Sequence, residues 1–132
     1  MPTDAVVATR HPKDVKTILR LEGLAVLVIA GVAYGALGGN WWLFALLILA
    51  PDLSFAGFLA GQKVGVYCYN SVHNYALPLA IGLLAYLFGQ MAVMPFMAIW
   101  VAHIGADRFL GYGLKYADAP QQTHLGRIGK QK

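Results

Sequence analysis

The sequence contains few charged residues and a single cysteine. Of its 132 residues, 12% are Asp, Glu, Lys or Arg and 58% are hydrophobic, and the mean hydropathy is +0.58. Soluble domains carry about 25% charged residues, so this composition favours a single domain whose solvent is the lipid bilayer. Cys68 is the only cysteine, which excludes an internal disulfide and fits a position facing the cytoplasm.

Signatures of common hydrolases and nucleotide-binding proteins are also missing. The chain has no HExxH, CxxC or GxSxG motif and no phosphate-binding glycine loop. Its formal net charge of +4 comes from basic residues scattered beside apolar runs. This pattern favours contact with a membrane surface, and we expect no nucleic-acid partner.

Four apolar runs predict an all-α fold, a four-helix transmembrane bundle, because about 20 apolar residues cross a hydrocarbon core of about 30 Å. A polar segment at 1–17 precedes the membrane domain at 18–116, and a polar tail at 117–132 follows it. Pro51 is expected to kink the second helix beside Asp52. The predicted helices cover residues 18–37, 41–60, 70–88 and 91–116.

All ten Lys and Arg residues fall on one side of this predicted bundle. They precede or open the first helix, lie between the second and third, or end and follow the fourth. The turns near Asn40 and Gln90 contain none. The positive-inside rule therefore predicts a multi-pass protein of the inner membrane with both termini in the cytoplasm.

Two series of glycines recur at four-residue spacing. Such spacing lets helices approach closely, so the series are expected to pack helices within the bundle. Besides the bilayer, a helix-packing partner or a second copy of the chain is the alternative contact. The two series are Gly31, Gly35 and Gly39, and Gly57, Gly61 and Gly65.

Each predicted helix carries an ionisable residue at a similar depth. Counting inward from the two outer turns at about 1.5 Å per residue, Asp52 and His103 lie about 18 Å deep, and His73, Asp107 and Glu22 about 24 Å. A charge at membrane depth costs at least about 2.5 kcal/mol, so these groups are expected to face protein or water. The sequence predicts that they meet in one pocket near the inner leaflet.

Asp52, His73, His103 and Asp107 are the candidate catalytic and metal-binding residues. Two carboxylates and two imidazoles suit Zn²⁺, Mn²⁺ or Fe²⁺, and such an ion lowers the pKa of a bound water to about 7. His103 and Asp107 are four residues apart and share one helix face. The structural alternatives are that Asp52 caps backbone groups freed at the kink and that His73 hydrogen-bonds between helices.

Four further polar residues are expected to support this site: Glu22, Asn70, Arg108 and His124. Glu22 is expected to pair with Arg20 or Arg108 at the membrane interface. Arg108 is expected to reach the lipid headgroups. Asn70 lies one turn before the candidate histidine of the third helix.

Several short runs carry a resemblance to a known family. They are Trp41-Trp42-Leu43-Phe44, Ala50-Pro51-Asp52-Leu53-Ser54, Tyr69-Asn70 with His73, His103-Ile104-Gly105-Ala106-Asp107-Arg108, Gly111-Tyr112-Gly113-Leu114-Lys115-Tyr116 and Thr123-His124-Leu125-Gly126-Arg127. Over roughly residues 19–129 the chain resembles the bacterial four-helix integral membrane family catalogued as domain of unknown function 4260. The resemblance implies no activity, but it implies that His124 or Arg127 folds back over the inner mouth of the bundle.

A more distant resemblance concerns Pro51-Asp52, His73 and the His103 and Asp107 pair. These residues are similar to a pattern in inner-membrane metal-dependent hydrolases linked to the DNA-damage regulon, and the similarity implies metal-dependent hydrolysis. Here Ser54 stands where that family tends to have a second acid. The paired middle histidines of that family are reduced to one.

These observations predict a small inner-membrane protein with a polar His/Asp site near the cytoplasmic leaflet. The leading hypothesis is a metal-dependent hydrolase-like site acting on a lipid or another amphiphile. The alternative from another class is a non-enzymatic structural or accessory subunit of a membrane complex. A proton or ion path ranks third, because the outer halves of the predicted helices lack ionisable residues.

Overall fold

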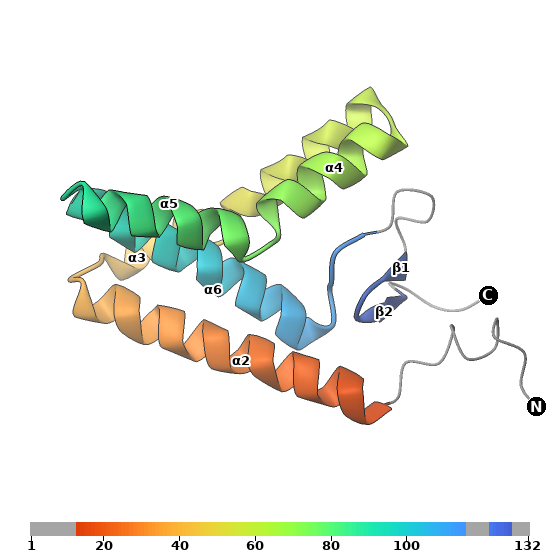
Figure 1. Ribbon diagram of the computed structural model, residues 1–132, viewed down its shortest axis with the longest axis horizontal. Coiled ribbons are helices and arrows are strands. Elements are labelled where there is room, and N and C mark those ends of the chain that lie inside the picture. The colour runs from red at the N-terminus through yellow and green to blue at the C-terminus, as the bar shows by residue number, and fades with distance from the viewer. Residues whose placement is uncertain (1–12, 116–121, 128–132) are drawn as a thin grey trace, which may run out of the picture.

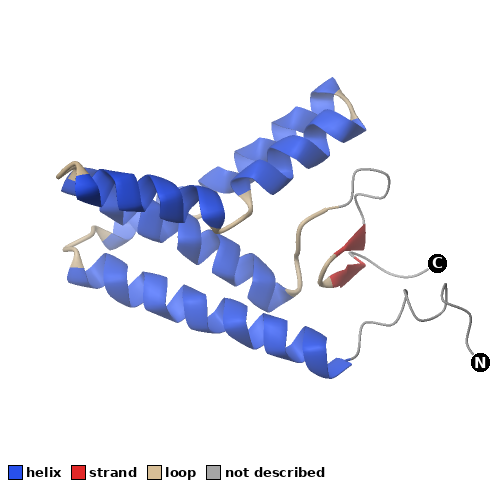
Figure 2. Cartoon of the chain, viewed as in Figure 1, coloured by secondary structure: helices blue, strands red, loops and turns tan. Residues whose placement is uncertain are grey.

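The computed structural model describes residues 13–115 and 122–127, which are almost entirely helical (Figures 1 and 2). A short antiparallel strand pair follows the last helix. In chain order the elements are α2 (Lys13–Ala36), α3 (Trp41–Leu47), the 3₁₀-helix η1 (Ala50–Ala60), α4 (Gln62–Val72), α5 (Ala76–Leu87), the 3₁₀-helix η2 (Met91–Val93), α6 (Met94–Leu110), β1 (Gln122–Thr123) and β2 (Gly126–Arg127).

Helix α6 lies at the centre of the arrangement. It packs along α2 on one side and against α5 on another, while η1 and α4 pair with each other and lean away from these three helices (Figure 1). The start of α2, the turn between η1 and α4, and the end of α6 lie toward one end of the molecule. The α2–α3 and α5–α6 turns lie toward the other (Figure 1).

The turns are formed by residues with special backbone requirements. Gly38, Gly89 and Gly111 have φ values of 74°, 70° and 94°, a region that L side chains rarely adopt. After the first of these turns, the Asn40 side chain accepts a hydrogen bond of 2.8 Å from the Trp42 N–H and caps α3. Local sequence therefore determines where these helices end.

Two predicted helices are divided in the structure, and a third is shorter. The predicted helix 41–60 consists of α3 followed by η1, because Pro51 has no N–H with which to continue an α-helical ladder. The predicted helix 70–88 is replaced by α5, and α4 is a separate helix that ends before His73. The last predicted helix ends at Leu110 rather than 116, since Gly111 adopts the left-handed conformation.

Three segments are long and apolar enough to cross a membrane: Lys13–Ala36, Trp41–Ala60 and Met91–Leu110. Large apolar side chains such as Leu59 (92% exposed) and Trp42 (86% exposed) face outward, as they do when lipid is the solvent. Helix α5 is apolar but only 12 residues long. The chain is therefore a helical protein suited to a membrane, and a fourth crossing stays a prediction.

Helices α2 and α6 touch backbone to backbone at two glycines. A Cβ atom placed on Gly105 would lie 2.8 Å from both the carbonyl oxygen of Gly23 and the amide nitrogen of Leu27. Contacts this short leave no room for a side chain. This close approach fixes the position of α6, and with it the residues that α6 contributes to the site.

The two predicted glycine series act mostly inside the chain. Gly39 lies against the buried ring of Tyr34, and Gly57 and Gly65 form close contacts between η1 and α4. A Cβ at Gly31 would meet nothing within 4 Å. Contact of either series with a partner helix or a second copy of the chain stays a prediction.

We expect Gly105→Ala to lower the thermal unfolding midpoint in detergent, because the added methyl group collides with α2 at a cost of about 1 to 3 kcal/mol. Gly31→Ala is the matched control, since its methyl group enters open space and alanine favours a helix. Equal midpoints for the two variants would contradict the backbone contact between α2 and α6.

Candidate metal centre

Four side chains from three parts of the chain converge beside α6. Asp52 comes from the first turn of η1, His73 follows the end of α4, and His103 and Asp107 project from α6. One donor atom from each residue can be chosen so that all four lie within 4.8 Å of one another. The structure thus brings together the four residues that the sequence singled out.

The nitrogen and oxygen atoms of this cluster are close together. The His103 Nε2 atom lies 3.2 Å from Asp52 Oδ1, from Asp107 Oδ2 and from His73 Nε2. The His73 Nε2 atom lies 3.2 Å from Asp52 Oδ1 and 3.5 Å from Asp107 Oδ2. Ligand bonds of about 2.0 to 2.2 Å in a tetrahedron separate the donor atoms by roughly 3.3 to 3.6 Å, so the spacing suits one small ion.

The opposite nitrogens of both imidazoles are directed at backbone carbonyl oxygens. His73 Nδ1 lies 2.9 Å from the Tyr69 oxygen, and His103 Nδ1 is hydrogen-bonded to the Ile48 oxygen. A carbonyl only accepts, so each neutral ring carries its hydrogen on Nδ1 and turns the lone pair of Nε2 toward the cluster. Histidines that bind metals are oriented in this way.

The break before η1 supplies one of these carbonyls. In a continuous α-helix the Ile48 oxygen would accept from the Asp52 N–H, but that N–H donates to the Leu49 oxygen at 3.0 Å. The Ile48 oxygen is thereby left for the His103 ring. Pro51 therefore acts on the site twice, because it sits beside Asp52 and leads into the tighter helix.

The end of α4 is joined to α6 by two side chains. Trp100 Nε1 donates to the Val72 oxygen at 2.6 Å, and Arg108 Nη2 donates to the His73 oxygen at 3.1 Å. The last carbonyls of a helix have no partner in their own ladder, and a cation near them is favourable. These contacts hold the backbone around His73 against α6.

Aromatic packing orients the His73 ring. The Tyr69 ring stacks on it with centroids 3.9 Å apart and planes 11° apart. On Tyr69 in turn lies the Lys115 ammonium, 4.8 Å from the ring centroid. Burial of this ammonium group lowers the pKa of Lys115, because desolvation disfavours its charged form.

The cluster is accessible from its carboxylate side. The His73 and His103 side chains are 3% and 4% exposed, whereas those of Asp107 and Asp52 are 20% and 39% exposed. Two carboxylates with two neutral imidazoles carry a charge of about −2, which a divalent cation would neutralise. The group could therefore hold such an ion and present it to a molecule approaching past Asp52.

Two of the four supporting residues, Arg108 and Glu22, differ from the prediction. Arg108 is 8% exposed and bonded within the protein, so its predicted extension to the headgroups is wrong. Glu22 forms no ion pair with Arg20 or Arg108 in the described ranges, and the Arg20 Nε atom donates to the Phe109 oxygen at 2.8 Å. Arg20 and Arg108, the expected partners of Glu22, donate to backbone oxygens instead.

Asn70 and His124 tie the segment after α6 to the bundle. The Asn70 amide donates to the Lys115 oxygen and accepts from the Lys115 N–H, both at 2.7 Å. His124 contacts Arg108, with ring nitrogens 2.7 and 3.1 Å from Nη1, so this part of the tail folds back as expected. The side chain of Arg127 lies outside the described residues.

Sequence reasoning missed the groups that orient the four candidates. These are the carbonyls of Ile48 and Tyr69 and the indole of Trp100. Only the first had a signal in the sequence, since Pro51 marks a place where a helix leaves carbonyls free. The other two depend on where α4 ends, which the apolar pattern does not reveal.

Comparison with known proteins identifies one family. A family described as "Domain of unknown function (DUF4260)" matches residues 16–128. No curated protein and no solved structure matches the chain. The first resemblance drawn from the sequence is confirmed, and the more distant one to metal-dependent hydrolases stays a prediction.

We expect Asn70→Ala to speed hydrogen exchange at the Lys115 amide by tenfold or more, because losing its hydrogen bonds costs about 1 to 3 kcal/mol. The matched control is Ser71→Ala, whose hydroxyl donates to the Tyr67 oxygen of its own helix. Unchanged exchange in the Asn70 variant would show that this amide does not hold the chain after α6.

Proposed function

Because the chain belongs to this family of unknown function, its role rests on the site itself, and we propose that it is a membrane metalloprotein with hydrolase activity. In this proposal Asp52, His73, His103 and Asp107 bind one divalent ion, Zn²⁺, Mn²⁺ or Fe²⁺. The substrate is a lipid or another amphiphile with an ester or phosphoester bond.

One observation carries the metal assignment. Five of the six pairs among the four donor atoms are 3.2 to 3.5 Å apart, and all four atoms lie within 4.8 Å of one another. Both imidazoles, when neutral, use their single hydrogen on a carbonyl outside the cluster. With neutral rings and ionised carboxylates, no hydrogen lies between the donors, so their lone pairs repel. A cation bound by all four turns this repulsion into coordination.

The surroundings support an amphiphilic substrate. A hollow of about 300 Å³ along α6 is lined by apolar groups that include Trp100, Pro51 and Val72, and the last two precede Asp52 and His73 in the chain. An apolar chain in this hollow would lie one residue away from two of the proposed ligands. This arrangement fits a substrate that enters from the membrane.

The proposed chemistry assigns separate tasks to the ion and to one carboxylate. A bound divalent ion would supply a water of lowered pKa. Asp52, the most exposed of the four side chains, would accept the water proton as the oxygen attacks the ester carbon or phosphorus. The bond to the leaving oxygen then breaks, and that oxygen receives the proton.

We further propose that the protein crosses the inner membrane several times with both termini in the cytoplasm. Basic residues occur at the start of α2, at the η1–α4 turn and near the end of α6, elements that lie toward one end of the molecule (Figure 1). This distribution supports the topology through the positive-inside rule. The cluster would then lie nearer the cytoplasmic leaflet.

A non-enzymatic role is the second candidate. Its support is that four protein side chains could each supply one ligand, as in structural metal sites. The ion would then hold η1, α4 and α6 together and make the bundle rigid, as an accessory subunit of a membrane complex requires. The tests of metal content and of activity separate the two roles.

Purified protein is expected to contain about one equivalent of divalent metal, and His103→Ala or Asp107→Asn is expected to remove at least nine-tenths of it, because loss of one ligand leaves an incomplete site. Glu22→Gln is the control, since this acid lies outside the cluster. Metal analysis of the dialysed proteins gives the answer. The absence of stoichiometric metal from the unmutated protein would overturn the assignment.

Metal-loaded protein in mixed micelles is expected to release products from membrane lipids. Asp52→Asn is expected to lower the rate at least about 100-fold, because it removes the general base and alters one ligand of the ion. Chelation should abolish turnover. If chelation lowers the thermal unfolding midpoint while no ester or phosphoester lipid is cleaved at any metal loading, the structural role holds and the hydrolase role is wrong.

A further inference from the structure

A second surface of α6, away from the metal cluster, borders a groove with an apolar and a polar part. The apolar part is a hollow of about 610 Å³ between α2 and α5, floored by α6. A second hollow of about 500 Å³ adjoins it toward the start of α2 and shares Val26 and Tyr75 with the first. The two hollows meet at these two side chains and together are called the groove.

The groove and the metal cluster lie on different faces of α6. Val101 lines the apolar part of the groove and is two residues from His103, about 200° around the helix. No cluster residue lines either hollow. A molecule bound in the groove is therefore distinct from a substrate at the metal.

The polar end of the groove presents hydrogen-bond donors. Arg108 and His124 line it, and the Leu114 N–H donates to His124 Nδ1 at 3.0 Å. When this ring is neutral, its hydrogen is on Nε2, which lies 2.7 Å from Arg108 Nη1, itself a donor. Two donors placed side by side favour a negatively charged acceptor that lies within reach of both.

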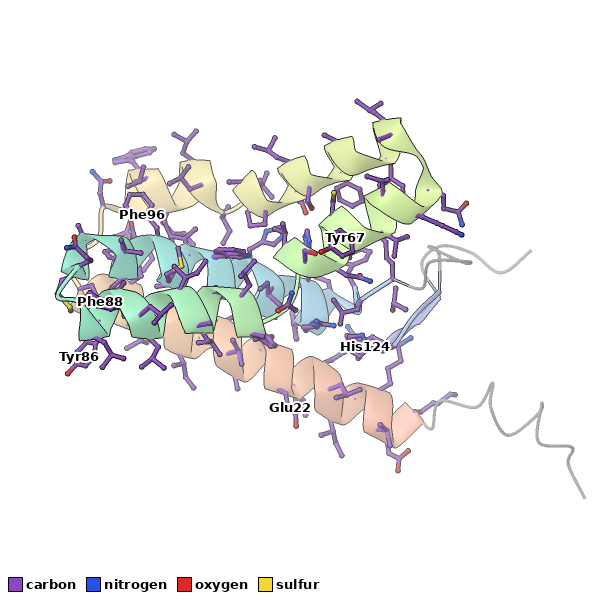
Figure 3. The ribbon with its side chains drawn as sticks, turned by 45° about the horizontal axis from the view of Figure 1, so that its top comes forward. Glu22, Tyr67, Tyr86, Phe88, Phe96 and His124 are labelled. Atoms are coloured by element: carbon purple, nitrogen blue, oxygen red, sulfur yellow. The ribbon has the colours of Figure 1, made fainter. Side chains whose placement is uncertain are left out.

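Tyr75 adds a third donor where the hollows meet. Its hydroxyl is buried beside the Arg108 side chain, whose guanidinium lies 5.8 Å from the ring centroid. Arginine can only donate hydrogen bonds, so the hydroxyl hydrogen stays available to a bound acceptor. Glu22 also lines the polar hollow, from the exposed surface of α2; Figure 3 shows Glu22 and His124 toward the same end of α2.

The length of the apolar part matches one leaflet. From Val26 to Leu37 on α2 it extends about 16 Å, close to half of a hydrocarbon core of about 30 Å. Its lining is almost wholly apolar, as an acyl chain requires. An apolar groove of leaflet length that ends at an arginine has the shape and charge order of a phospholipid.

We propose that this groove binds one glycerophospholipid, with an acyl chain between α2 and α5 and the phosphate at Arg108 and His124. The arginine connects the two faces of α6, because its Nη2 atom also donates to the His73 oxygen. A lipid phosphate at this position would strengthen the packing of the strand pair β1 and β2 against the bundle.

Native mass spectrometry of the full chain in detergent tests the proposal with phosphatidic acid and with diacylglycerol of the same chains. We expect phosphatidic acid to bind about tenfold more tightly, which corresponds to about 1.4 kcal/mol. Arg108→Gln should abolish this preference while diacylglycerol still binds. Loss of binding of both lipids would instead indicate that the variant is misfolded. His124→Ala then serves as the second variant.

Ala33→Trp places a large ring in the apolar part and should lower phosphatidic acid binding about tenfold or more. Ala36→Trp is the matched control, an exposed alanine of α2 that does not line the groove. Metal content should be unchanged in both variants, so failure here is distinct from failure of the metal site. Equal binding by the two variants, or full displacement of the lipid by equimolar inorganic phosphate, would overturn the proposal.

Discussion

Repulsion among four electron-pair donors is the constraint around which this structure is built. Two carboxylates and two imidazole nitrogens are held within 4.8 Å of one another inside a largely apolar chain. Such a group is stable only if its surroundings hold each ring in place and a cation or protons offset the charge. The Ile48 and Tyr69 carbonyls hold the rings, and their position leaves the inner nitrogens of neutral rings without hydrogen.

Interruptions of the helices make this arrangement possible, because they free backbone carbonyl oxygens. The tighter helix after Pro51 frees the Ile48 oxygen, and the end of α4 frees the oxygens of Val72 and His73 for side chains of α6. Continuous helices would have used all three oxygens internally. Within a membrane, freed backbone groups must find partners in the protein, so each interruption is linked to a specific side chain.

Helix α6 separates two surfaces of different chemistry. One carries His103 and Asp107, and the other floors the apolar groove beside α2 and α5. The close contact of Gly105 with α2 holds the helix between them. Arg108 contacts both the His73 oxygen and the His124 ring, so it links the segment that carries His73 to the strand pair β1 and β2.

The sequence by itself determined the helical class, the suitability for a membrane and the four residues of the cluster, because apolar runs fix the length of segments and equal depth places His73 level with Asp107. Tertiary structure alone decided which nitrogens face inward, that Arg108 is buried, and that α4 and α5 are separate helices. These features depend on contacts between residues far apart in the chain, such as Trp100 with Val72, and an apolar pattern carries no record of such partners.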